Sequence, residues 1–184
     1  MALGAQAQAV IQDLSSLQAS FEADTLSTNH LADFEARSRQ KTSDLFDYME
    51  LIAAINNNEK LTGHTFRMIE KLFLSDTCQV YALDVPTNNS TIASIIEAQA
   101  IPTWFQPNGK ALQQDASNIA LRPTADGGYT GILHFYLNPA DEEGTPEAHT
   151  VEIHVQRTTK RFGKETRKVW EVYLCDVDAP WNQE

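Results

Sequence analysis

The sequence predicts an α+β fold in which helices are followed by a mainly antiparallel sheet. Apolar residues recur at helical spacing through roughly the first 75 residues, and from Thr77 onward the apolar period changes to two. Roughly the last 60 residues form long alternating stretches separated by turn residues, which is typical of hairpins. A chain of 184 residues with 42% hydrophobic content is long enough for one domain with its own core.

Three segments of the first part have helical periodicity. Apolar spacing predicts a first helix over residues 5–23. A second stretch over residues 31–52 is almost wholly polar at residues 35–43, so we expect one long helix or two joined helices that project in part from the core. Thr62 is the expected N-cap of a third helix, whose apolar face ends at Phe73.

The strand part begins with an alternating stretch over residues 78–83. A short helix is expected next, with Asn89 or Ser90 as its N-cap and Pro102 as its stop. This helix interrupts the strands.

A first hairpin is predicted from a strand near residues 118–122 and a returning strand over residues 129–137. Asp126-Gly127-Gly128 lies between them, and glycine readily adopts the positive φ that such a turn needs. An acidic, proline-containing loop over residues 138–148 leads to the final strands.

The longest predicted hairpin joins residues 150–159 and 168–178 through a turn at residues 162–165. With that turn, position i faces position 327 − i. The expected apolar pairs are Val155 with Val172 and Ile153 with Leu174. The opposite face pairs His154 with Tyr173, Gln156 with Glu171, and Glu152 with Cys175.

The polar face of this hairpin holds three of the six candidate ligand-binding residues. Imidazole titrates near neutral pH and a half-buried carboxylate can shift toward it, so such a cluster could bind a polar group or transfer a proton. The pocket candidates are Tyr48, His134, Tyr136, His154, Glu171 and Tyr173. The alternative is an ordinary half-exposed sheet face, because polar residues alternate on such a face in any antiparallel sheet.

Charge is unevenly distributed along the chain. The formal net charge is −11, with 25 acidic and 14 basic residues, which argues against nucleic acid or an anionic membrane as the main partner. Six bases lie within twelve residues around the last turn, namely Arg157, Lys160, Arg161, Lys164, Arg167 and Lys168. They form either a solvated strand end that resists aggregation or a docking point for an acidic partner or a neighbouring subunit.

The N-terminal sequence favours export. Ala5-Gln6-Ala7 and Ala7-Gln8-Ala9 match the A-x-A pattern of signal-peptidase sites, so we expect a periplasmic or secreted protein rather than a cytoplasmic one. No apolar run approaches the about 20 residues that span a bilayer. Cys78 and Cys175 lie in predicted strands and are expected to be small buried residues, although an oxidising compartment would allow a disulfide between neighbouring strands.

Several common catalytic motifs are absent from the sequence. There is no G-x-S-x-G elbow, P-loop, H-E-x-x-H, C-x-x-C or Rossmann glycine pattern. The five histidines lack the i, i+4 spacing of ligands on a predicted helix. The sequence therefore predicts neither a metal nor a cofactor.

The element order over residues 43–178 resembles the nuclear transport factor 2-like superfamily. The segments that carry this resemblance are residues 45–52, 66–73, 151–155 and 169–174. It implies a strongly curved sheet wrapped around helices, a cystatin-like cone with a pocket at its mouth, and dimerisation through the outer face of the sheet. It also implies a division into an N-terminal helical arm (1–42), the superfamily domain (43–178) and a tail (179–184).

Two functions follow from this resemblance, because the superfamily includes both enzymes and non-catalytic domains. The favoured one is a non-catalytic binding or assembly domain, exported and homodimeric, with a protein partner or a small apolar ligand. The alternative is a cofactor-independent enzyme or carrier of the isomerase or dehydratase kind, with an apolar pocket. The enzyme requires Tyr48, His154 and Tyr173 to converge on one cavity.

Overall fold

The computed structural model describes residues 25–55, 59–81, 89–98, 111–114, 119–138 and 146–178. The predicted first helix over residues 5–23 and the predicted tail over residues 179–184 lie outside these ranges.

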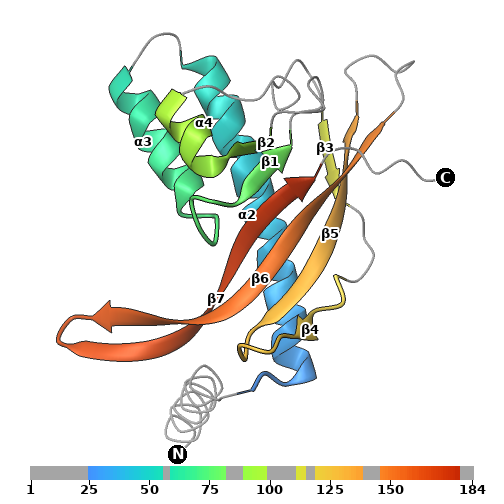
Figure 1. The fold of residues 1–184 in the computed structure, drawn as a ribbon, viewed down its shortest axis with the longest axis vertical. Helices are drawn as coiled ribbons and strands as arrows, with labels where there is room; N and C mark the ends of the chain where they lie inside the picture. The colour runs from blue at the N-terminus through green and yellow to red at the C-terminus, as the bar shows by residue number, and fades with distance from the viewer. Residues whose placement is uncertain are drawn as a thin grey trace, which may run out of the picture.

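The described residues form helices packed on a mixed sheet, which confirms the predicted α+β class (Figure 1). The helices are α2 (Thr28–Ala54), α3 (Glu59–Glu70) and α4 (Ile92–Ala98). The strands are β1 (Gln79–Tyr81), β2 (Asn89–Thr91), β3 (Ala111–Gln114), β4 (Arg122–Pro123), β5 (Tyr129–Asn138), β6 (Glu147–Phe162) and β7 (Glu165–Asp178). The seven-stranded sheet has the order β2-β1-β7-β6-β5-β3, with β4 paired to β5, and the β1–β7 pair is parallel.

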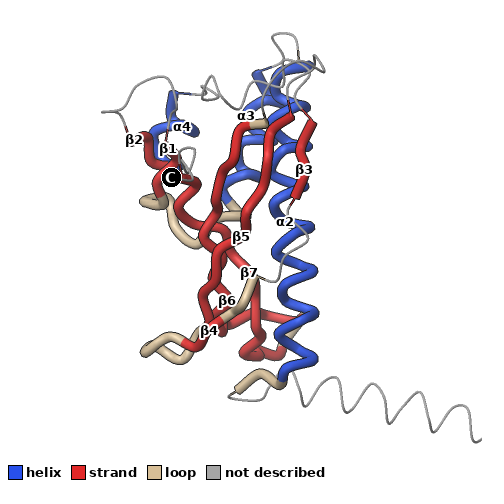
Figure 2. Tube along the Cα trace, turned by 90° about the vertical axis from the view of Figure 1, so that its right-hand side faces the viewer, coloured by secondary structure: helices blue, strands red, loops and turns tan. Residues whose placement is uncertain are grey.

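Helix α2 is one continuous helix that lies along the sheet (Figure 2). Its buried face includes Ser38 and Thr42, which belong to the polar middle of the stretch. The Ser38 hydroxyl donates to the Phe34 carbonyl at 2.7 Å, and the Thr42 hydroxyl donates to the Ser38 carbonyl at 3.0 Å. Because these bonds satisfy both hydroxyls, this part of the helix packs in the core instead of projecting from it. The predicted boundary at residue 42 falls inside α2.

The starts of the two shorter helices differ from the sequence prediction. Helix α3 begins at Glu59, so Thr62 is not its N-cap. Asn89 and Ser90 lie in β2, and Thr91 takes the capping role at α4 by accepting a hydrogen bond from the Ser94 amide at 3.2 Å.

The register predicted for the final hairpin is confirmed through most of its length. Val155 pairs with Val172, His154 with Tyr173, and Gln156 with Glu171. Gly163, in the turn, has a φ of 65°. A register shift between Val151 and Ile153 removes the expected pairing of Glu152 with Cys175.

The first hairpin has a shorter outgoing strand than predicted. In the outgoing segment 119–123, Arg122 and Pro123 pair with β5, and residues 119–121 run beside that strand without forming one. The predicted turn is confirmed, because Gly127 has a φ of 85° and the Thr124 amide donates to the Gly128 carbonyl at 2.9 Å.

The outer part of the β6–β7 hairpin projects beyond the rest of the sheet (Figure 1). Strand β5 begins opposite Val155, and β1 joins β7 at Val177. Within the described ranges, residues 156–171 therefore form a two-stranded ribbon, which we call the ribbon arm. An isolated two-stranded hairpin is marginally stable in water, so the base of the arm needs support from packing.

That support comes from Trp170, which is 2% exposed. Its ring lies 5.7 Å from the Tyr129 ring in an edge-to-face arrangement. The Tyr129 hydroxyl accepts a hydrogen bond from the Leu26 amide at 3.0 Å, just before α2. The base of the ribbon arm is thus packed into the core beside the start of the long helix.

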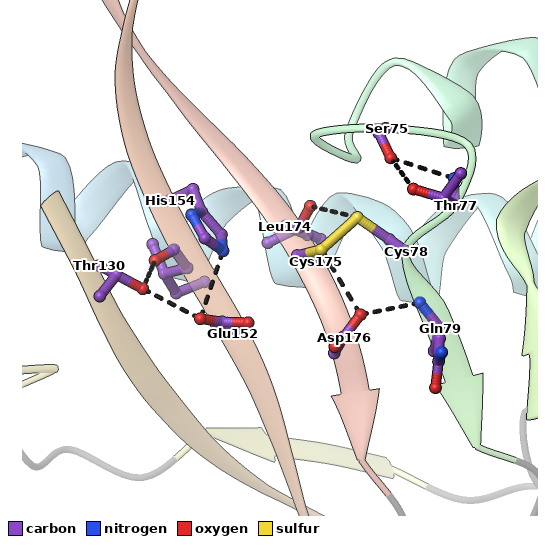
Figure 3. The surroundings of a disulfide bond; sticks show 11 residues. Ser75, Thr77, Cys78, Gln79, Thr130, Glu152, His154, Leu174, Cys175 and Asp176 are labelled. Atoms are coloured by element: carbon purple, nitrogen blue, oxygen red, sulfur yellow. Dashed lines mark hydrogen bonds and ion pairs between the residues drawn. A yellow bond between two sulfur atoms is a disulfide. The ribbon is translucent and has the colours of Figure 1, made fainter. Parts of the chain in front are cut away.

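Cys78 and Cys175 form a disulfide, so the expectation of two unbonded cysteines is wrong (Figure 3). The two Cα atoms are 5.0 Å apart although 97 positions separate the residues in sequence. Parallel pairing of Val80 with Val177 brings the segments together. The sequence pattern predicted both strands but not that they are neighbours.

Candidate functional site

The face of the sheet opposite its buried residues carries a polar cluster. Ile153 and Leu174 are fully buried, whereas their neighbours Glu152 and His154 are partly exposed. The Thr130 hydroxyl lies 3.2 Å from Glu152 Oε1, to which it donates. His154 Nε2 lies 3.4 Å from the same carboxylate oxygen (Figure 3). Two neighbouring strands, β5 and β6, therefore position this group of side chains.

The disulfide borders this cluster on the β7 side (Figure 3). Asp176 Oδ1 accepts a hydrogen bond from the Gln79 amide at 2.8 Å and lies 3.5 Å from Cys175 Sγ. Asp176 thereby links β7 to β1 beside the covalent bond. The described residues include two groups whose possible ligand atoms lie within 4.8 Å of one another: Cys78, Cys175 and Asp176, and Glu152, His154 and Cys175.

A pocket of about 450 Å³ adjoins the polar cluster. Its lining combines residues from the 119–122 segment, from β5 and from β6: Ile119, Ala120, Arg122, Thr130, Gly131, Ile132, His134 and Glu152. A Cβ atom at Gly131 would lie 2.8 Å from the Ile119 carbonyl oxygen. Glycine at this position allows the 119–121 segment to approach β5 and form one wall of the pocket.

Of the six pocket candidates from the sequence, His134 lines this pocket. Its lining, as far as the described residues go, does not include Tyr48, His154 or Tyr173. Tyr48 packs against the core from α2, and Tyr136 is half-buried on β5. Tyr48, His154 and Tyr173 are therefore not brought together in this pocket.

Glu171 and Tyr173 belong to a separate hydrogen-bonded network at the base of the ribbon arm. The Glu171 carboxylate accepts hydrogen bonds from the Tyr173 hydroxyl at 2.9 Å and from the Thr158 hydroxyl at 2.8 Å. Lys160 Nζ donates to the other oxygen of the same carboxylate. Lys41 of α2 has its Nζ 4.9 Å from the centre of the Tyr173 ring. These contacts make the network a connection between the arm and the helix.

Burial and hydrogen bonding shift the pKa of Glu171 in opposite directions. Burial would raise its pKa, but hydrogen bonds from Lys160, Thr158 and Tyr173 together hold that pKa below its ordinary value. Burial also raises the pKa of Tyr173 and lowers the pKa of Lys41. A carboxylate already held ionised by three donors is poorly suited to take up a proton during catalysis.

Glu171→Gln is expected to lower the free energy of unfolding by about 1 kcal/mol at neutral pH, because it removes the charge from a partly exposed hydrogen-bonded carboxylate. The folded-state pKa of Glu171 lies below 4.5, so its stabilising effect is present above 4.5 and is lost as pH falls through the folded-state pKa. The difference between wild type and variant should therefore shrink in acid, measured by urea unfolding at several pH values. Glu165→Gln, in the exposed pair with Arg167, is the control and should change stability little. An equal effect of both variants would contradict the prediction.

The six bases proposed for docking lie on the ribbon arm in different local settings. Lys160 pairs with Glu171, Arg167 with Glu165, and Arg161 Nε donates to the Gly163 carbonyl at 2.9 Å. The Arg157 guanidinium lies 5.9 Å from the centre of the Trp170 ring. Lys164 and Lys168 are exposed, and Phe162 at the tip is 54% exposed. The tip thus combines an aromatic ring with cations.

Sequence reasoning missed most of the pocket lining. Arg122 and Thr130 belong to the predicted first hairpin, but the hairpin pattern gave no signal that they face a cavity. The i, i+2 pair Glu152 and His154 did place both side chains on one strand face. That spacing was the available signal for the polar cluster.

In the described ranges, no helix combines the length and the apolar character that a membrane crossing requires. Comparison of the chain with protein-family models, with curated proteins and with solved structures gave no match.

Proposed function

We propose that the chain is a non-catalytic binding and assembly domain that acts outside the cytoplasm as a homodimer. The observation that carries this proposal is the ribbon arm, a two-stranded projection with a basic, aromatic tip. The exposed ring of Phe162 gives the tip an aromatic side chain, a type that is enriched at protein–protein interfaces.

Charge complementarity favours a second copy of the chain as the occupant. Residues 157–168 carry six bases and one acid, whereas the rest of the chain carries eight bases and 24 acids. Exposed acids on the body include Asp47 and Glu50 on α2 and Glu70 on α3. A two-fold arrangement in which each arm contacts the partner's body would close into a dimer and satisfy both charge excesses.

The bend of the sheet supports the finer fold proposal. Strands β6 and β7 curve along their length, and α2 lies against one face of the sheet (Figures 1 and 2). This arrangement is compatible with a cystatin-like cone and with the nuclear transport factor 2-like superfamily. The short helix α4 between strands β2 and β3 supports the same proposal.

The disulfide supports the exported location. Disulfides persist in oxidising compartments such as the periplasm and the extracellular space and are rare in the cytosol. Cys78 and Cys175 account for all the cysteines of the chain, so a single bond uses both thiols.

Wild-type protein is expected to have a mass near twice the 20.5 kDa of one chain, measured by size-exclusion chromatography with light scattering at low ionic strength. Lys164→Glu combined with Lys168→Glu should lower the measured mass toward that of the monomer, because both substitutions reverse charge at the tip. High salt should do the same, since the Debye length falls from about 10 Å at 0.1 M to about 3 Å at 1 M.

The matched control is Lys60→Glu combined with Lys71→Glu, which makes the same charge change at exposed positions in and after α3. This control should remain dimeric. A wild type that is monomeric at every concentration would contradict the proposal, and so would equal dissociation of the control and the tip variant.

A second candidate function is carriage of a small ligand in the 450 Å³ pocket. Arg122 could contact an anionic group, while Ile119 and Ile132 contact an apolar part. The isomerase or dehydratase form of this alternative has less support, because Tyr48, His154 and Tyr173 do not line the pocket as described.

A further inference from the structure

We propose that Glu152, His154 and Cys175 form a zinc site that is available only when the Cys78–Cys175 disulfide is reduced. The three side chains offer a carboxylate oxygen, an imidazole nitrogen and a sulfur atom, all within 4.8 Å of one another. These are the ligand types that zinc binds in proteins, and three of them leave a fourth position for water. The proposal is independent of the dimer, and it shares Glu152 with the pocket described above.

The geometry of Glu152 and His154 already approaches that of two ligands sharing a metal. The distance between Glu152 Oε1 and His154 Nε2 is 3.4 Å. Two ligand atoms that each lie about 2.1 Å from a zinc ion at a tetrahedral angle are about 3.4 Å apart. Glu152 Oε1 and His154 Nε2 therefore need to move little for both atoms to bind one zinc ion.

Strand pairing places the three residues close together. Glu152 and His154 are two positions apart on β6 and project from the same face, and Cys175 lies on the adjacent strand β7. Thr130 donates a hydrogen bond to Glu152 Oε1 and so holds the carboxylate from outside the ligand set. All three ligands are half-buried, with the His154 side chain 19% and the Glu152 side chain 39% exposed, which leaves a path for the ion.

The disulfide determines whether the third ligand is available, because a disulfide sulfur lacks the negative charge of the thiolate that binds zinc. A dithiol reductant attacks the bond through a mixed disulfide; the dithiol is oxidised to its own disulfide, and Cys78 and Cys175 each gain one electron and one proton as thiols. Zinc binding then displaces the Cys175 proton to solvent, so that a sulfur–zinc bond replaces a sulfur–hydrogen bond. Disulfide formation with Cys78 and zinc binding thus compete for the sulfur of Cys175.

The sulfur ligand also favours zinc over harder cations. Magnesium and calcium prefer oxygen ligands, whereas thiolate and imidazole suit zinc and cobalt. Cobalt is a useful probe for this reason, because a thiolate bound to it gives a charge-transfer band in the near ultraviolet.

The test uses the full chain with zinc or cobalt as the probe. Wild-type protein is measured with its disulfide intact and after treatment with a phosphine reductant. The phosphine reduces the disulfide to two thiols and is itself oxidised to a phosphine oxide, whose oxygen comes from water. Zinc affinity is measured by competition with a chromophoric chelator. Reduced wild type should bind one zinc per chain and give the cobalt–thiolate band, and oxidised wild type should do neither. Equal zinc binding by the oxidised form would overturn the proposal.

Two single-cysteine variants, both kept in phosphine, provide a matched pair. Cys78→Ser and Cys175→Ser each lack the disulfide, but only Cys78→Ser keeps the three proposed ligands. Zinc should bind Cys78→Ser as a one-to-one complex, and Cys175→Ser should bind at least about 100-fold more weakly, because losing a direct ligand exceeds the about 10- to 100-fold cost of losing an outer partner. Equal affinities would assign the metal to other residues and refute the site.

His154→Gln provides a further variant should either serine variant fail to fold, as judged by circular dichroism. It keeps both cysteines, so it can be purified oxidised and then reduced. Zinc affinity after reduction should fall by at least about 100-fold relative to reduced wild type. Unchanged zinc affinity in folded His154→Gln would contradict the proposal.

Discussion

Cys78→Ser combined with Cys175→Ser is expected to lower the free energy of unfolding by about 2–5 kcal/mol. The bond closes a loop between residues 97 positions apart, and the chain-entropy model assigns about 4.7 kcal/mol to a loop of about 100 residues. The effect arises mainly in the unfolded chain, which the bond restricts. Urea unfolding followed by circular dichroism, with a chelator present so that metal does not replace the bond, measures the change.

Reduction supplies the control for this prediction. Phosphine should destabilise wild type by the same amount as the double substitution and should leave the double variant unaffected. A loss of less than about 1 kcal/mol would show that the unfolded chain gains little freedom when the bond is removed, against the expectation.

Trp170→Ala is expected to lower the free energy of unfolding by about 3–5 kcal/mol. The ring is 2% exposed and packs edge-to-face on Tyr129, so truncation leaves a cavity where the ribbon arm joins the core. Trp170→Phe should lower the free energy of unfolding by less, because it retains an aromatic ring near Tyr129. Chemical unfolding of the three proteins under identical conditions gives the comparison.

Val169→Ala is the matched control, since Val169 is the half-buried neighbour on the other face of β7. Val169→Ala should lower the free energy of unfolding by about 1 kcal/mol, because Val169 buries less apolar area than Trp170 does. If Trp170→Ala destabilised the chain no more than Val169→Ala, the base of the arm would not depend on the packing described above.

The final hairpin was the part of the fold best predicted from sequence. A period of two over long strands and the glycine in the turn together fix one register, and the pairs Val155 with Val172 and His154 with Tyr173 follow from it. The shift between Val151 and Ile153 depends on one extra residue in the ladder, for which the apolar pattern gives no signal. Glu152 consequently lost its predicted partner but stayed within reach of Cys175.

The buried hydroxyls of α2 explain a different kind of error. Ser38 and Thr42 are polar in any hydropathy pattern, yet both are buried because they donate to carbonyls one turn earlier in their own helix. A hydrogen bond within the helix offsets the free-energy cost of burying a hydroxyl, although the residue is still counted as polar in a sequence pattern. A pattern based on polarity therefore predicted a projecting segment where the helix packs on the sheet.

The candidate site was only partly predictable because its residues come together through long-range pairing. His134 was identified from its alternation, but the pocket also needs the 119–121 segment to lie against Gly131. The Cys78–Cys175 bond likewise depends on parallel pairing between β1 and β7, which are distant in sequence. Local patterns describe strands but do not specify which strands become neighbours.

The disulfide also closes residues 78–175 into a covalent ring. A single backbone cut between Cys78 and Cys175 opens the ring but leaves both pieces in one molecule, whereas a cut outside it releases a fragment. Because both termini lie outside the ring, trimming at either end leaves the ring intact. Helix α4, strands β3 to β6 and most of β7 therefore stay joined to the β1 segment after any single cleavage among them.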